Sequence, residues 1–226
     1  MKHPLPILAT LAASASLGIG CLPLAAQDPA QLCKAIGMVT VGQWASYSVT
    51  GASGHSGKAR FAIVGSERRS DTTLYWIEIS GSGMGTRGEG IMQVLVPGLG
   101  VEASGIHGMV VKTAGQPAMK MPDQMLGMMN QRMAENNPAL AITRRCGSAR
   151  AVGWETVTVP AGSIKALHMK DPEGGEAWMS RDIPFGIVKA HSKDGDLVLT
   201  GRGMDAKSSI AEKPLEMPGV MMNPHQ

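Results

Sequence analysis

The sequence predicts a mainly β protein of the α+β class: a single curved antiparallel sheet of about ten strands with one helix packed against it. Short segments rich in β-branched and aromatic residues follow one another, separated by Gly-, Ser- and Asp-rich turns. They have no helices between them, as a doubly wound α/β fold would require. One amphipathic segment, residues 118–133, divides them into two groups. Two strand-rich halves joined by one helix most economically form one sheet, and no 20–50-residue period indicates a repeat protein.

The first 26 residues predict a secretory signal peptide. Lys2 gives a basic start, an apolar run covers residues 5–22, and Ala25 and Ala26 supply the small residues of a cleavage site. The run is too short and wrongly flanked for a retained membrane span. We therefore expect a periplasmic or secreted protein with no integral membrane segment after cleavage.

Cys21 offers an alternative, a lipid anchor, because lipoprotein signals end in a small residue followed by cysteine. Gly20 precedes Cys21 here, but Leu17 lies one place too early for the usual motif, so cleavage after Ala26 is favoured. The two remaining cysteines, Cys33 and Cys146, are predicted to form a disulfide, since an exported protein meets an oxidising compartment.

Residues 27–210 are predicted to form one β-rich domain, because a chain of about 200 residues buries one core well and hardly two. Residues 211–226 are Pro-rich and aperiodic and are expected to be a flexible tail. The formal net charge is only +3, and basic residues are scattered, so nucleic acid is not an expected partner. The sequence names no protein partner.

The first half of the chain contains five expected strands. Four combine β-branched and aromatic residues, and a weaker one follows them. They cover residues 43–50, 58–66, 72–80, 91–97 and 105–113. The linking stretches GASGHSG, ERRSD and GSGMGTRGEG have the composition of turns.

The second half repeats this style. Residues 154–169 are expected to form two strands around a Pro-Ala-Gly turn, and three more strands follow at 176–180, 186–192 and 196–201. Asp194 and Gly195 form a dipeptide typical of tight hairpins.

The segment AMKMPDQMLGMMNQRM, residues 118–133, holds six methionines and predicts an amphipathic helix starting at Pro122. At 100° per residue, its apolar residues fall within an arc of about 160°. They are Met121, Met125, Leu126, Met128, Met129 and Met133.

Three interpretations of this methionine face stay open. It can be ordinary core, because methionine fills irregular space. It can be a groove for an apolar ligand, since flexible thioethers repack around different guests. It can also bind copper(I), which prefers soft sulfur ligands.

No catalytic constellation and no cofactor motif is evident. Residues 83–88 match G-x-G-x-x-G, but an expected strand follows them where a dinucleotide site needs a helix. His55 stands beside Ser53 and Ser56 without an associated acid or a nucleophile elbow. His168 and His191 each lie in an expected strand and could become neighbours across a sheet, but no ligand spacing supports a zinc site. We expect no enzyme activity, no metal and no cofactor.

The stretch from Trp154 to Gly201 resembles small exported bacterial proteins of uncharacterised function, which are similar to the periplasmic lipoprotein-carrier and outer-membrane lipoprotein-receptor superfamily. The shared pattern is a strand, a Pro-Ala-Gly turn, a strand ending near histidine, a Trp strand, a Pro-Gly bend and two closing strands. It rests on Val159, Pro160, Ala161, Gly162, His168, Trp178, Pro184 and Gly186.

This resemblance implies an unclosed β-barrel with a helix on its concave side and an apolar hollow between them. In the carriers that hollow accepts lipoprotein acyl chains, although no functional residue can be transferred to this sequence. The first hypothesis is therefore a noncatalytic envelope protein that binds an apolar ligand, such as lipid acyl chains. The alternatives are a structural or interaction module with a filled core and a methionine-based copper(I) protein.

Overall fold

The structure is a computed structural model, and it describes residues 32–33, 39–82, 89–99, 105–135, 146 and 148–217. The expected signal peptide, Cys21 and residues 218–226 lie outside these described residues.

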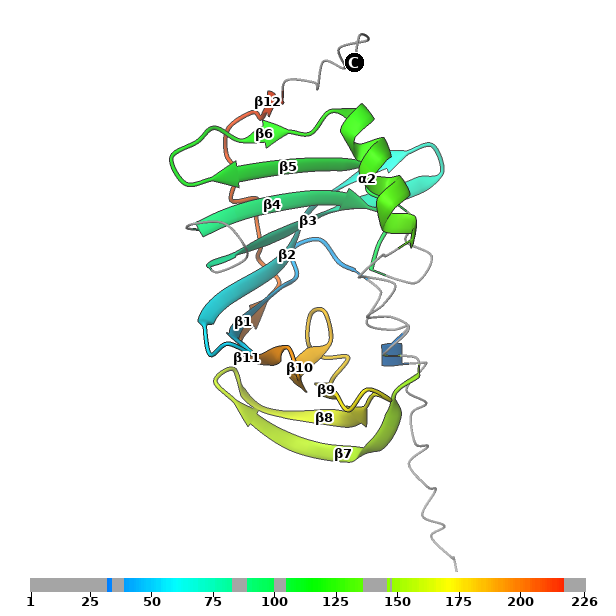
Figure 1. The fold of residues 1–226 in the computed structure, drawn as a ribbon, viewed down its shortest axis with the longest axis vertical. Helices are drawn as coiled ribbons and strands as arrows, with labels where there is room; N and C mark the ends of the chain where they lie inside the picture. Colours follow the sequence, from blue (N-terminus) through cyan, green and yellow to red (C-terminus); the bar gives the residue numbers. More distant parts are fainter. Residues whose placement is uncertain are drawn as a thin grey trace, which may run out of the picture.

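Within the described residues, twelve strands form one sheet in the order β12-β6-β5-β4-β3-β2-β1-β11-β10-β9-β8-β7 (Figure 1). The strands are β1 (Trp44–Gly51), β2 (Ser56–Arg69), β3 (Thr72–Ser82), β4 (Glu89–Val96), β5 (Gly108–Thr113), β6 (Met119–Lys120), β7 (Arg150–Val159), β8 (Gly162–Lys170), β9 (Glu176–Met179), β10 (Ile187–Ser192), β11 (Gly195–Gly203) and β12 (Leu215–Glu216). The helix α2 covers Asp123–Glu135. The predicted mainly β fold, a curved open sheet with one helix packed on it, is confirmed. The ten predicted strands are present, and the sheet has two further strands, β6 and β12, of two residues each.

Two antiparallel meanders make up this sheet. One runs from β1 to β6 and the other from β7 to β11, and β1 pairs with β11 to join them (Figure 1). The hairpin between β10 and β11 requires glycine at Gly195. Its φ is +136°, and a Cβ there would lie 2.1 Å from the carbonyl oxygen of Thr50.

Helix α2 packs on one face of the first meander. Strand residues alternate between faces, so Ile77, Val94 and Met109 point to the same side and form a buried cluster with Leu126 of the helix. Phe185, in the loop before β10, contacts this cluster, and its ring centre lies 5.9 Å from that of Phe61 with the two rings tilted by 52°.

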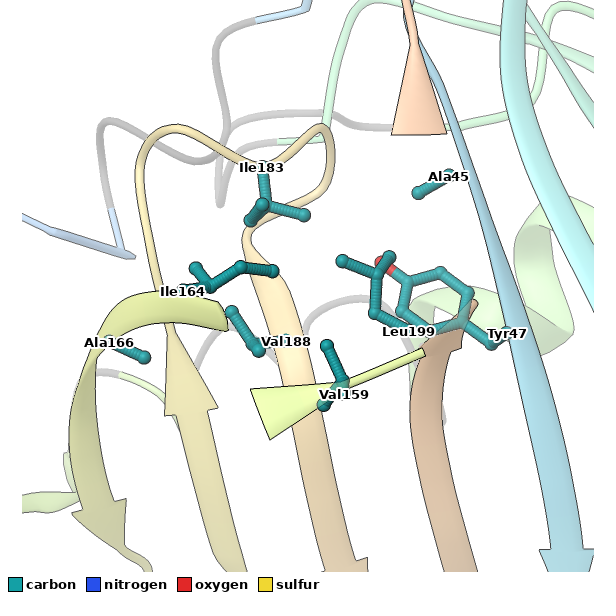
Figure 2. Packing of buried hydrophobic residues seen from close by; sticks show 8 residues of the cluster. All are labelled: Ala45, Tyr47, Val159, Ile164, Ala166, Ile183, Val188 and Leu199. Atoms are coloured by element: carbon teal, nitrogen blue, oxygen red, sulfur yellow. The ribbon is translucent and has the colours of Figure 1, made fainter. Parts of the chain in front are cut away.

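A second apolar core fills the join between the meanders. Tyr47 of β1 and Leu199 of β11 meet side chains from β7, β8 and β10, and Figure 2 shows them converging on a common interior. The Tyr47 hydroxyl donates to the carbonyl oxygen of Ile187 at 3.2 Å, and burial raises the pKa of this phenol. Strands from both ends of the domain therefore share one core.

Residues 204–217, which follow β11 and are called the C-terminal segment, cover the other face of the first meander. Ile210 packs beside Val110 and Ala118, and β12 pairs with β6 in parallel. The sheet thus extends into the segment that the sequence assigned to a flexible tail.

Cys33 and Cys146 form a disulfide with their Cα atoms 6.0 Å apart. Leu32, beside Cys33, is buried against Leu167 and Met169 of β8. The disulfide therefore fastens a segment preceding β1 to the second meander.

Candidate functional site

The structure places the predicted methionine residues unevenly around α2. Leu126 is 4% exposed, and Met121 and Met129 are half-buried against the same cluster. Met125 is also half-buried, whereas Met128 is 43% exposed. The side chain of Met133 lies outside the described part of the chain.

This arrangement differs from the single methionine stripe that the sequence predicts. Leu126 and Met128 lie at the two edges of the predicted arc, about 160° apart around the helix. Once Leu126 faces the strands, Met128 therefore turns away from them. The layer between α2 and the sheet is occupied by side chains.

Hydrogen bonds hold α2 near its middle and just before its first residue. Asn130 accepts from the backbone N–H of Ile106 at 2.8 Å and donates to the carbonyl oxygen of the same residue at 2.9 Å. Just before the helix, the N–H of Met121 donates to the carbonyl oxygen of Met109 at 2.9 Å. Asp123 in the first turn complements the positive end of the helix dipole.

The opposite face of the sheet carries an open groove of about 480 Å³. Its floor follows a row of cross-strand neighbours from β1 to β5, namely Ser46, Arg60, Ser80, Ile91 and Lys112. Directly paired residues share a face of the sheet, and successive residues of a strand point to opposite faces. Ile79 packs against the cluster under α2, so Ser80 and the row that it belongs to point away from α2. Sequence reasoning did not find this groove.

Three cationic side chains line the groove. Lys112 forms an ion pair of 2.5 Å with Glu212, and this hydrogen bond holds the pKa of the Glu212 carboxyl below its usual value. Arg60 lies 3.8 Å from Glu78 and 5.1 Å from the centre of the Trp44 ring. Among the described residues, the ammonium of Lys58 has no carboxylate within ion-pair distance.

Glu78 supports the groove from within the sheet and is 0% exposed. Its Oε2 accepts from Gln93 Nε2 at 2.8 Å and from the backbone N–H of Ser209 at 2.9 Å. Its Oε1 accepts from the Ser209 hydroxyl at 2.7 Å. A buried carboxylate thus fixes both Arg60 and the C-terminal segment that borders the groove.

A second polar cluster lies on β8, β9 and β10. His168 stacks on Trp178 with ring centres 4.3 Å apart, and its Nε2 lies 2.9 Å from Glu176. His191 on β10 pairs across the strands with Glu176 on β9, and its Nδ1 lies 2.5 Å from Asp196, so β9 lies between the strands that carry the two histidines. Hydrogen bonds from Lys170, chiefly, and from His168 lower the pKa of Glu176.

The acids and bases of this cluster are paired with one another. Glu155 accepts from the indole N–H of Trp178 and lies 3.4 Å from His168. Lys189 lies 5.0 Å from the centre of the Trp178 ring. We interpret the cluster as a surface network that stabilises the second meander.

The other sequence candidates do not form a reactive site in the described residues. Ser53 and His55 hydrogen-bond at 2.8 Å on an exposed turn. Residues 83–88, with the G-x-G-x-x-G match, lie outside the description. The described ranges hold no group of three or more His, Cys, Asp or Glu side chains placed for a metal ion, and no helix in them has the length and apolarity to cross a membrane.

One sequence signal for the groove existed. Lys58 and Arg60 are two residues apart in an expected strand, so both cationic side chains lie on the same face. Lys112 joins them only through the pairing of β3, β4 and β5, and that register was not readable from local patterns.

No family model and no curated protein matches this chain. One similar solved structure is described as an exported protein with a YmcC-like fold from Bacteroides fragilis. It is 11% identical, has a TM-score of 0.33, and the match covers 73% of this chain and 96% of that chain. Another is described as a lipoprotein from Parabacteroides distasonis, with 11% identity, a TM-score of 0.36, and coverage of 74% and 98%. At these values we draw no functional inference, and neither description names the lipoprotein-carrier superfamily.

Proposed function

We propose that the protein is an exported, noncatalytic protein of the cell envelope that accommodates an apolar ligand, such as a lipid acyl chain, between the sheet and α2. Met121, Met125 and Met129 would line the ligand, and Met128 would cover it when the helix turns. Met133, one helical turn after Met129, is proposed to contact the ligand as well.

The observation that supports this proposal is the composition of the layer beneath α2. Among the helix side chains that the structure describes, Leu126 is the buried one that meets the sheet, and its half-buried neighbours Met121 and Met129 are flexible thioethers. Thioethers repack at little cost in strain, so an acyl chain could replace their contacts with the buried cluster. Ligand entry requires α2 to move outward, because side chains now occupy this layer.

The experiment is extraction of the protein, purified from its native envelope, with organic solvent, followed by mass spectrometry. Bound lipid in the extract and saturable binding of a fluorescent fatty acid are the expected results. A matched pair of variants locates the site: Leu126→Gln should abolish probe binding, while Gln124→Leu on the exposed side of α2 should not. A protein that yields no lipid and binds no fatty-acid probe is not a carrier of this kind.

A structural or interaction module with a filled core is the second candidate, and the burial of Leu126 favours it. Replacing Met125 and Met128 together with leucine conserves volume, so a filled core predicts nearly unchanged stability. The same double variant tests copper(I) binding by thioethers, since it would remove stoichiometric metal from a copper protein.

A further inference from the structure

The groove on the face opposite α2 carries hydrogen-bond donors and hydroxyl groups among apolar side chains such as Ile91 and Ala114. Lys58, Arg60 and Lys112 contribute cationic donors, and Ser46, Ser80 and Thr200 add hydroxyls. Ammonium and guanidinium groups carry no acceptor, so the ligand must supply acceptor atoms. These donors suit a polar anion.

The three cations of the groove differ in their partners. Glu78 lies against Arg60, and Glu212 lies against Lys112. Beside the hydrogen bond from Trp44, Arg60 also lowers the pKa of the Asp205 carboxyl. Lys58 has no carboxylate within ion-pair distance among the described residues, so its ammonium is the one left to pair with an anion. Because Lys58 is exposed on β2 and flanks the floor row, its ammonium can reach a bound carboxylate or phosphate.

The other two cations are held in place before any ligand arrives. Arg60 is fixed between buried Glu78 and the ring of Trp44. Trp44 in turn donates its indole N–H to Asp205 at 2.7 Å, and this hydrogen bond lowers the pKa of Asp205. Preorganised donors reduce the ordering cost of binding, which favours a specific site over a diffuse surface charge.

The size of the groove points to an organic anion. Small-molecule sites commonly measure about 300–1,000 Å³, and this groove measures about 480 Å³. An inorganic ion alone would leave most of the hydroxyl groups without contact. A hydroxylated scaffold bearing one anionic group would use both the cations and the hydroxyls.

We propose that this groove is a binding site for a small hydroxylated organic anion, a hydroxy acid or a phosphate monoester, whose anionic group pairs with Lys58. The site lies on the opposite face of the sheet from α2 and does not depend on the apolar ligand proposed above.

Isothermal titration calorimetry with two matched probe pairs tests this proposal. D-Gluconate is compared with neutral D-sorbitol, and glycerol 3-phosphate with neutral glycerol; inorganic phosphate serves as a further probe. At least one organic anion should bind, more weakly in high salt, while its neutral counterpart does not. Preference for gluconate or for glycerol 3-phosphate identifies the anionic group as carboxylate or phosphate.

Two lysine variants locate the binding. Lys58→Gln should weaken binding of the organic anion by about ten- to a hundredfold, which is the effect of losing one charge-assisted hydrogen bond. Lys193→Gln removes the same charge from the exposed turn before β11 and should change affinity less than twofold. Both positions are exposed, and circular dichroism checks that both variants fold.

Four outcomes would overturn the proposal. They are failure of both organic anions to bind at millimolar concentration, equal binding of a neutral counterpart, binding of inorganic phosphate as tight as that of glycerol 3-phosphate, and equal effects of the two lysine substitutions.

Discussion

Replacing the buried carboxylate Glu78 is expected to destabilise the protein strongly. Glu78→Ala removes three hydrogen bonds made by Gln93 and Ser209, together with the 3.8 Å approach of Arg60. Each hydrogen bond to a charged group is worth about 1.5–3 kcal/mol. Water entering the vacated space recovers part of this, so we expect a loss of about 3–5 kcal/mol, as for other broken buried pairs.

Thermal unfolding followed by circular dichroism measures this loss. For a domain of this size, a loss of about 3–5 kcal/mol should lower Tm by about 6–20 °C. Glu78→Gln keeps the volume and loses the charge, so its Tm should fall between those of Glu78→Ala and the wild type. Ser209→Ala removes one of the three hydrogen bonds and should cost about 1.5 kcal/mol, the lower end of that range, because Ser209 is exposed.

Glu216→Ala is the matched control. Glu216 is 68% exposed and pairs with Lys120 at 3.0 Å on the surface, so its loss should cost about 0–1 kcal/mol. If Glu78→Ala lowers Tm no more than Glu216→Ala does, Glu78 does not anchor the C-terminal segment.

Three further predictions concern stability. Leu126→Ala should cost about 2–5 kcal/mol in urea unfolding, whereas Met128→Ala should stay within about 0.5 kcal/mol; similar losses would show that α2 faces the sheet differently. Reduction of the disulfide should lower stability by about 2–5 kcal/mol, and an unchanged urea midpoint after reduction would contradict this. Lys112 lowers the pKa of Glu212 in the folded state. The stability advantage of wild type over Glu212→Gln should therefore be full above the unfolded pKa near 4.5 and fade as pH falls through the lower folded value. Urea titrations at neutral and acidic pH measure this advantage, and growth of the advantage on acidification would refute the prediction.

The strands were predictable from the sequence because their signals are local. Residues 72–80 were expected and β3 covers Thr72–Ser82, and the Pro-Ala-Gly turn separates β7 from β8 as expected. β6 and β12 were missed because two residues are too few for a local strand pattern; β6 is defined by its pairing with β5 and β12 by its pairing with β6.

The sites depended on information that the sequence does not carry locally. Helical periodicity placed Leu126 and Met128 on one broad face, but which part of that arc meets the sheet is decided by tertiary packing. The groove depends on the register of successive strands, in which a slip of one residue would turn Arg60 to the other face.

The join between β1 and β11 bears on the order in which the chain folds. Ser48 and Val198, which pair across it, are 150 residues apart, whereas each meander is built from hairpins between neighbouring strands. Long-range pairing is slow because loop closure must precede its contacts. The two halves can therefore form early, but the centre of the sheet must wait for the last long strand. For the exported protein that the leader predicts, this late join would keep the chain from completing its fold until nearly all of it had crossed the membrane.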